Sequence, residues 1–181
     1  MRVLGIDPGL TRCGVAVVEG RAGATLTAVH IGVIRTHPDE PVERRLQGVF
    51  VGLSALVEEF EPDSIAIERV FSQQNVRSAM STAQAAAMGL LLAGQRGLPV
   101  ALHTPTEVKA AVTGSGRADK AQVTSMVTRI LRLPGPPKPA DAADALAIAV
   151  CQIWRGGAQR RLAGAVEQAQ AALAAGSGRR V

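Results

Sequence analysis

The sequence is poor in aromatic residues, cysteine and histidine, and each shortage excludes a class of site. It has no tyrosine, one tryptophan and three phenylalanines, which argues against a surface that stacks several nucleic-acid bases. Its two cysteines, Cys13 and Cys151, and its three histidines, His30, His37 and His103, have no metal-ligand spacing, so neither zinc nor a disulfide is expected. Two distant thiols instead suggest a reducing cytosol and a cytoplasmic protein.

Long hydrophobic runs are also missing. No apolar stretch is long enough to span a bilayer, and we see no export signal at the N-terminus, so no membrane partner is expected. With 181 residues, 47% hydrophobic and 19% charged, the chain fits one soluble globular domain. The excess of 20 Lys and Arg over 15 Asp and Glu favours a polyanionic partner.

The first part of the chain predicts three strands followed by a helix. Residues 3–7 form a short apolar run bounded by turn residues, which indicates a buried strand, and residues 14–19 and 25–36 predict two more. Between residues 41 and 60, apolar side chains recur at steps of three and four, the pattern of an amphipathic helix. The three strands would form an antiparallel meander.

The second part predicts strands that alternate with helices. Strands at 64–68 and 99–103 would add to the meander in parallel, which predicts an α/β fold with a five-stranded mixed sheet flanked by helices. Residues 1–155 would form one domain, and residues 156–181 a basic, alanine-rich tail that we expect to be flexible. The remaining elements are predicted as helices from about 75 for roughly twenty residues, at 104–113, at 118–133 and at 141–154, with a proline-rich linker at 134–139.

The predicted helix after residue 75 carries apolar side chains along one side. These are Met80, Ala83, Ala87, Leu90 and Leu91. We expect this side to pack into the core, as amphipathic helices generally do. The alternative is contact with another protein chain, because small residues let a second helix approach closely.

Two predicted strands end in a carboxylate. Asp7 closes the first strand just before Pro8-Gly9, and Glu68 closes the strand at 64–68. An unpaired charge at the end of a core strand is costly, which predicts a cationic partner for each. For Asp7, a plain turn-capping role is equally open at this point, because Asp beside Pro-Gly is common in turns.

Two further carboxylates, Asp141 and Asp144, lie three residues apart at a predicted helix start and so share one face. Taken alone, they suit helix capping. Taken with Asp7 and Glu68, they supply the oxygen ligands of a divalent-metal site. Four carboxylates about 5 Å apart would repel by roughly 3 kcal/mol per pair at an effective dielectric near 20, so the group favours one or two bound Mg²⁺ or Mn²⁺ ions.

Three segments in order resemble the bacterial RuvC Holliday-junction resolvases, which are ribonuclease-H-like nucleases. The segments are Gly5-Ile6-Asp7-Pro8-Gly9, Ile67-Glu68-Arg69-Val70-Phe71 and Asp141-Ala142-Ala143-Asp144-Ala145-Leu146-Ala147. The resemblance implies a ribonuclease-H-like fold over residues 1 to about 155. It also implies a homodimer that resolves four-way DNA junctions by paired, symmetric phosphodiester hydrolysis in recombination and repair. Contacts with a branch-migration helicase complex are implied as well.

The resemblance also assigns residue roles. Asp7, Glu68, Asp141 and Asp144 would be the catalytic metal ligands, with Mg²⁺ as the ion and Mn²⁺ able to substitute. Residues matching DNA contacts of the family are Lys109 and Lys120 at the scissile backbone and Phe71 at the bases. We also expect Arg69 and Arg77 to contact the DNA backbone.

Residue chemistry bears on these DNA contacts separately. Two lysines on helices are more often simply solvated, but Lys109 and Lys120 flank a Gly-Ser-Gly break whose amides could approach a phosphate. Phe71 stands in a polar stretch, an odd place for a core aromatic, which favours a wedge or stacking role. The sequence departs from the family where Gln84-Ala85-Ala86-Ala87 replaces an expected Gln-Ala-Arg-Gly, so no arginine contact is predicted there.

Three other functions stay open on the residues alone. An actin-like ATPase shares the opening strand and its acid, but needs a second domain for which this chain is too short. A non-catalytic DNA-binding module would use the acids only as caps. A ribonuclease-H-like nuclease acting on hybrids or flaps would share the carboxylates.

Overall fold

Five strands form one mixed sheet in the computed structural model, which describes residues 1–69, 76–139 and 141–156. The sheet order is β3-β2-β1-β4-β5, with β1 antiparallel to β2, β2 antiparallel to β3, and the β1–β4 and β4–β5 pairs parallel. The predicted mixed sheet is therefore confirmed. The strands are β1 (Arg2–Asp7), β2 (Arg12–Glu19), β3 (Thr27–Arg35), β4 (Ser64–Glu68) and β5 (Val100–His103).

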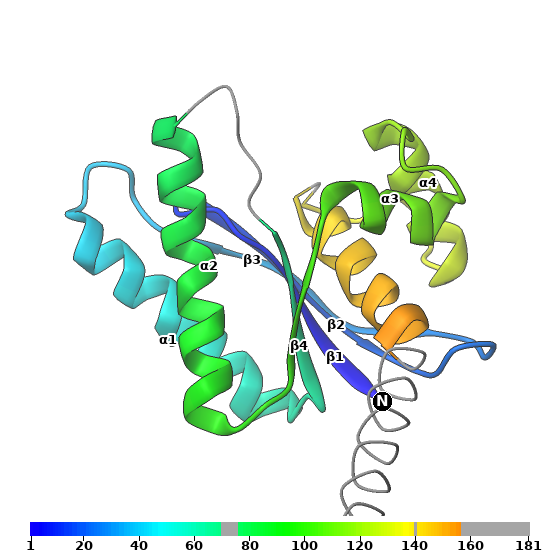
Figure 1. Ribbon diagram of the computed structural model, residues 1–181, viewed down its shortest axis with the longest axis horizontal. Helices are drawn as coiled ribbons and strands as arrows, with labels where there is room; N and C mark the ends of the chain where they lie inside the picture. Colours follow the sequence, from blue (N-terminus) through cyan, green and yellow to red (C-terminus); the bar gives the residue numbers. More distant parts are fainter. Residues whose placement is uncertain (70–75, 140, 157–181) are drawn as a thin grey trace, which may run out of the picture.

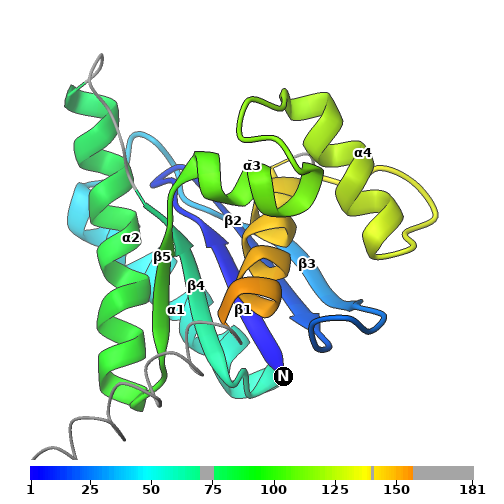
Figure 2. The same cartoon turned by 45° about the vertical axis from the view of Figure 1, so that its right-hand side comes forward.

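Helices cover both faces of the sheet. On one face lie α1 (Val42–Phe60) and α2 (Val76–Arg96), and on the other lie α3 (Pro105–Thr113), α4 (Lys120–Ile130) and a helix over residues 142–156, called helix 142–156 below (Figures 1 and 2). Two hydrophobic clusters, one on each side, fill the space between the layers. None of the helices in the described ranges has the length and apolar character that crossing a membrane requires.

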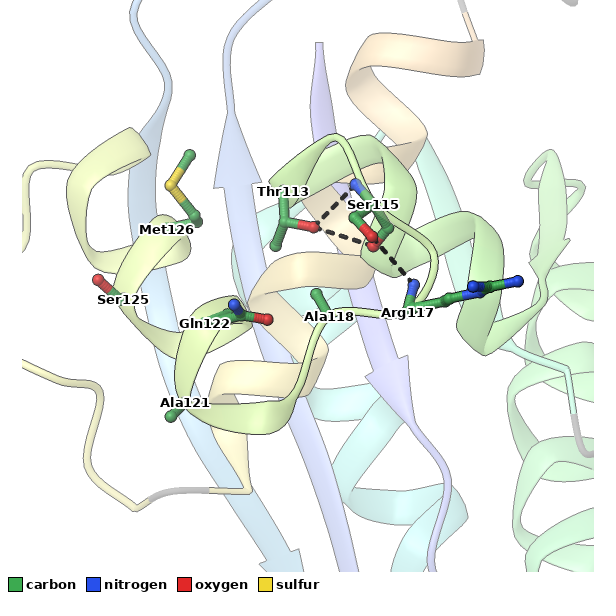
Figure 3. A pocket seen from close by; sticks show the side chains of 8 residues that line it. All are labelled: Thr113, Ser115, Arg117, Ala118, Ala121, Gln122, Ser125 and Met126. Atoms are coloured by element: carbon green, nitrogen blue, oxygen red, sulfur yellow. Dashed lines mark hydrogen bonds between the residues drawn. The ribbon is translucent and has the colours of Figure 1, made fainter.

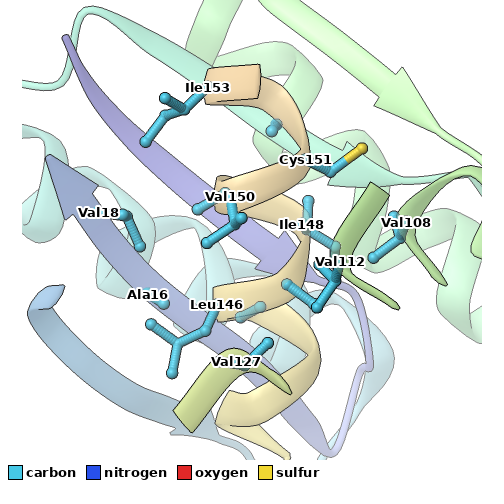
Figure 4. Close-up of a cluster of buried hydrophobic side chains, with 14 of the residues drawn as sticks. Ala16, Val18, Val108, Val112, Val127, Leu146, Ile148, Val150, Cys151 and Ile153 are labelled. Atoms are coloured by element: carbon cyan, nitrogen blue, oxygen red, sulfur yellow. The ribbon is translucent and has the colours of Figure 1, made fainter. Parts of the chain in front are cut away.

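Helix 142–156 is the centre of one of these cores. Every side chain from Ala145 to Cys151 is fully buried, which is expected of a helix that is apolar on all sides (Figure 4). Two glycines of the sheet let it come close. A Cβ on Gly5 would lie 2.2 Å from the Ala145 carbonyl oxygen, and one on Gly14 would lie 2.6 Å from the carbonyl oxygen of Asp141. The helix therefore rests directly on the backbone of β1 and β2.

The expected burial of one side of α2 is wrong. Met80, Leu90 and Leu91 are 58%, 38% and 49% exposed, and Ala83 and Ala87 are exposed as well. The helix buries a different stripe instead, made of Ala85, Ala86, Gly89, Leu92 and Ala93. This stripe also repeats at three- and four-residue steps, and Gly89 lets α2 approach the side chains of the sheet closely, while Met80, Leu90 and Leu91 point away from the core.

Gly5→Ala should test the contact between helix 142–156 and β1. The added methyl would meet the helix backbone, so we expect the free energy of unfolding to fall by about 1–3 kcal/mol. Gly94→Ala is the matched control, because a Cβ there meets nothing within 4 Å and alanine favours an exposed helix position. Urea unfolding of both variants makes the comparison. Equal stability of Gly5→Ala and the wild type would contradict the close packing.

Candidate active site

The parallel pairing of β1 and β4 brings the first two carboxylates together. Ile6 and Ile67 are partners in the register, and Asp7 and Glu68 are the next residues on each strand. Parallel neighbours end at the same edge of a sheet, so both acids emerge side by side as the strands leave the core. Both are partly buried, whereas the isoleucines that precede them are fully buried. A capping role alone does not account for two such acids at one edge.

Helix 142–156 adds the other two carboxylates at the same edge. Asp141 directly precedes the helix, and its carbonyl lies against Gly14, the residue that pairs with Asp7. Asp144, three residues on, shares that helix face. The close approach permitted by Gly14 therefore places an acidic helix start beside two acidic strand ends.

A cavity of about 240 Å³ lies where these elements meet. Carboxylates from β1, β4 and helix 142–156 and lysines from α3 and α4 line it together. Its lining consists of Asp7, Glu68, Asp144, Lys109, Lys120, Pro105, Val108 and Val123. Asp141 is not part of this lining but is close enough for its charge to act on Asp7. The structure thus brings three of the four predicted carboxylates and both predicted lysines into one cavity.

The carboxylates strongly perturb each other's protonation. Burial is the main cause that raises the pKa of Asp7 from 3.8 to about 7, and the negative charges of Glu68 and Asp144 add to it. Burial and the charge of Asp144 also raise the pKa of Glu68. The charge of Lys120 opposes the shift at both acids, and that of Lys109 opposes it at Glu68. The site is short of positive charge near neutral pH.

Two of the carboxylates form ion pairs with cationic side chains. Lys120 Nζ donates to Asp144 Oδ2 at 2.9 Å, which raises the pKa of that lysine, and Arg12 forms an ion pair with Asp141. In this arrangement, no three His, Cys, Asp or Glu side chains among the described residues form a ready metal cage. The donor set nevertheless fits a hard divalent cation, because it is all carboxylate and because burial and the neighbouring negative charges raise the pKa of Asp7.

Capping boxes fix the helices that carry the two lysines. Thr104 caps α3 with Glu107, and Asp119 caps α4 with Gln122. Asp119 also explains why α4 begins at residue 120 rather than at the predicted 118. Lys120 is therefore the first residue of its helix, directly after a defined cap. The lysine positions at the cavity follow from these local signals.

The other predicted DNA contacts are placed less fully. Arg69 follows Glu68 at the surface, and its backbone N–H donates to the His103 carbonyl. Phe71 and the side chain of Arg77 lie outside the described residues. Ala86 stands where the family motif has arginine, and it is buried at 7% exposure against the core. That helix position therefore serves packing in this chain.

Sequence reasoning missed Arg12 and the two glycines that position helix 142–156. Arg12 begins β2 and contacts Asp141, yet an arginine five residues after Asp7 has no distinctive pattern. Gly5 and Gly14 stand inside predicted strands, where glycine is a recognised sign of close backbone approach, so that signal was available.

A second cavity, of about 720 Å³, lies over the turn between α3 and α4 (Figure 3). Its polar side chains largely satisfy one another: the Thr113 hydroxyl accepts from the Ser115 N–H, and the Ser115 hydroxyl accepts from the Arg117 N–H. The lining holds no carboxylate, histidine or cysteine. The smaller cavity is therefore the better candidate for catalysis.

Comparisons with known proteins identify the family of this chain. A family model described as crossover junction endodeoxyribonuclease RuvC matches residues 3–152. The chain belongs to this family. Proteins of that name from Thermobifida fusca and Streptomyces avermitilis are 61% and 64% identical to it, over 90% and 92% of this chain and 90% and 94% of theirs. The resemblance inferred from three short segments is thereby confirmed.

A solved structure supports the RuvC assignment at the level of the fold. Thermus thermophilus RuvC, in complex with a Holliday junction substrate, superposes with a TM-score of 0.82 at 34% identity. The match covers 86% of this chain and 94% of that one. The expected ribonuclease-H-like fold is confirmed by this RuvC match.

Asp7→Asn should stabilise the metal-free protein at high pH. Between about pH 4 and pH 7 the folded state holds the Asp7 proton more tightly than the unfolded state does, so wild-type stability falls as the pH rises through that window. The neutral amide removes this loss. We expect a gain of about 2–4 kcal/mol at pH 8 that shrinks toward zero near pH 4.

Urea unfolding in EDTA at several pH values measures this effect. Glu19→Gln, which removes an exposed carboxylate at the far end of β2, is the control and should not reproduce it. A stability difference between Asp7→Asn and the wild type that does not vary with pH would show that Asp7 is not perturbed as described.

Proposed function

We propose that this protein is an endonuclease that resolves four-way DNA junctions by paired phosphodiester hydrolysis, in DNA recombination and repair. The observation that carries the proposal is the cavity in which Asp7, Glu68 and Asp144 face Lys109 and Lys120. At a phosphodiester, the acids would hold metal ions and the lysines would bind the phosphate. Membership of the RuvC family, and the junction-bound relative, point to the substrate.

We propose that Asp7, Glu68, Asp141 and Asp144 are the catalytic carboxylates and hold one or two Mg²⁺ ions, with Mn²⁺ able to substitute. Bound divalent ions of this kind activate a water and stabilise the leaving oxygen of a phosphodiester. Four acids without such ions would repel a phosphate. The high pKa of Asp7 supports this proposal, because the site favours added positive charge.

The residues of the chain supply binding and orientation. Lys109 and Lys120 line the same cavity as Glu68 and Asp7, so a scissile phosphate that enters would meet their ammonium groups. Lys120 donates to Asp144 in the structure, and in our proposal it exchanges this partner for phosphate when DNA and metal bind. Arg69 and Arg77 are proposed as further backbone contacts, and Phe71 as the aromatic that contacts bases at the junction.

We further propose that the protein acts as a homodimer, because two active sites suit paired, symmetric nicks. The exposed side of α2 supports this: Met80, Leu90 and Leu91 leave an apolar strip on the surface. A branch-migration helicase complex is proposed as a further partner on family resemblance alone.

Cleavage of a synthetic mobile four-way junction tests the proposed function. Wild-type protein with Mg²⁺ should nick the junction symmetrically and leave matched duplex intact, and EDTA should abolish cutting. Asp7→Asn should lose cleavage by at least about 10³-fold, the scale of a lost metal-ion effect, while binding the junction as tightly as wild type. Glu19→Gln should cut normally.

Stabilisation by Mg²⁺ provides a readout that does not depend on activity. Mg²⁺ should raise the melting temperature of the wild type and not that of Asp7→Asn. If the wild type binds junctions without Mg²⁺-dependent nicking or stabilisation, the protein is a DNA-binding module. If it cuts RNA–DNA hybrids or flaps in preference to junctions, it is a different ribonuclease-H-like nuclease.

Phe71→Ala should separate a role at the bases from a role in the core. If Phe71 contacts bases, the variant should lose about tenfold in junction cleavage or opening, since one stacked base contributes about 1–3 kcal/mol, with an unchanged melting temperature. Fluorescence of 2-aminopurine at the crossover measures opening, and Phe50→Ala, on the core side of α1, is the comparison that should lower stability. A similar loss of stability in Phe71→Ala would show it to be a core residue.

A further inference from the structure

Two arginines lie directly opposite each other beside the carboxylates. Arg12 at the start of β2 and Arg35 at the end of β3 are partners in the antiparallel register. Directly opposite residues point to the same face of a sheet, with Cβ atoms about 4.5–5.5 Å apart, and like charges in such a pair destabilise it. An anion bound between or above the two guanidinium groups would therefore reduce this repulsion.

The described residues supply only one such anion. Arg12 forms an ion pair with Asp141, and 53% of its side chain stays exposed. Arg35 is exposed, and within the described ranges its guanidinium makes no hydrogen bond or ion pair, not even with the acids of the following turn, Asp39 and Glu40. One carboxylate thus pairs with one of the two opposed cations, and the other has no anionic partner among the described residues.

A third arginine strengthens the positive charge at the same end of the sheet. The Arg45 guanidinium, near the start of α1, donates to the hydroxyls of Thr36 and Thr11, which follow Arg35 and precede Arg12. These bonds to neutral groups hold its charge next to the pair without neutralising it. Arg12, Arg35 and Arg45 are called the arginine flank below.

The arginine flank lies at the same end of the sheet as the carboxylates. Asp7 pairs with Gly14 on β2, two residues along that strand from Arg12, and β3 with Arg35 lies beyond β2. Lys109 and Lys120 line the carboxylate cavity itself, whereas Arg12 and Arg35 do not. The flank is therefore a cationic group next to the cavity and separate from the two lysines.

We infer that Arg12 and Arg35 form a second binding site for a backbone phosphate of nucleic acid, on the β2–β3 side of the carboxylate cavity. Planar guanidinium groups suit phosphate oxygens, and an anion placed there would relieve the repulsion between the two arginines. This inference rests on the proposed function, because it takes DNA as the ligand. If Asp141 held a metal ion, as proposed above, Arg12 would lose this partner and be free to bind phosphate.

Arg35→Ala tests the inference without touching a carboxylate. We expect junction affinity in EDTA to fall by about three- to tenfold at moderate salt, and the slope of log K against log salt to shrink by about 0.9, the value of one lost phosphate contact. Removing one of two opposed charges should leave the melting temperature unchanged or slightly higher. Fluorescence anisotropy with a labelled four-way junction over a salt series measures both DNA quantities.

Arg21→Ala is the matched control, because it removes an exposed arginine from the β2–β3 turn at the far end of the same strands. It should change neither the affinity nor the salt slope as much as Arg35→Ala does. Arg35→Lys, which keeps the charge but not the planar fork, should recover part of the affinity.

The outcomes separate this site from the proposed function. If the wild type does not bind junctions, the proposed function fails. If the wild type binds and cuts junctions while Arg35→Ala behaves as Arg21→Ala does, the phosphate site is wrong and the nuclease proposal stands. Weaker binding by Arg35→Ala together with a lower melting temperature would make Arg35 a structural residue and also overturn the inference.

Discussion

The direct contact of helix 142–156 with the backbone of β1 and β2 is the constraint on which the site depends. Gly5 and Gly14 leave no side chain between the helix and the sheet, so the start of the helix reaches the edge where Asp7 and Glu68 emerge. If side chains at these positions held the helix further from the sheet, Asp141 and Asp144 would no longer lie close to Asp7 and Glu68. The burial of the apolar helix and the position of the charged cluster at its start therefore both depend on the absence of side chains at Gly5 and Gly14.

This packing concentrates negative charge in a place that water only partly reaches. Burial makes each charge more costly, and the neighbouring charges add repulsion, which together account for the high pKa of Asp7. Lys120 and Arg12 compensate part of this charge by pairing with Asp144 and Asp141. Because both cations are side chains with exposed, rotatable ends, their pairing with the acids is reversible in a way that the packed helix is not.

Much of the fold followed from local patterns in the sequence. Apolar runs bounded by turn residues predicted the strands, and three- and four-residue periods predicted α1. For α2, the wrong stripe was assigned to the core because Met80, Leu90 and Leu91 are larger and more apolar than Ala85 or Gly89. Size favours burial in general, but here most of the positions of α2 that face the sheet are small, and Leu92 is the large residue among them. Which stripe faces the sheet is a tertiary property that periodicity does not contain.

The candidate site was predictable to a similar extent. Acids at strand ends and at a helix start stand out from apolar surroundings, so Asp7, Glu68 and Asp144 could be named from the residues, whereas Lys109 and Lys120 were named through the family resemblance. The pairing of Arg12 with Asp141 could not be predicted, since it depends on which face of β2 meets the helix. Nor could the opposition of Arg12 and Arg35, which follows from the register after an irregularity at Val17/Val18.

The register of β1 on β4 limits which insertions and deletions the first strand can tolerate. Side chains alternate between the two faces along a strand, so adding or deleting one residue between Arg2 and Asp7 would turn Asp7 toward α1 and α2, away from its partners. Exchange of one apolar residue for another in that segment leaves the acid where it is. Apart from Gly5, which the helix contact requires, the apolar positions of the segment can therefore vary in composition, but its length cannot change.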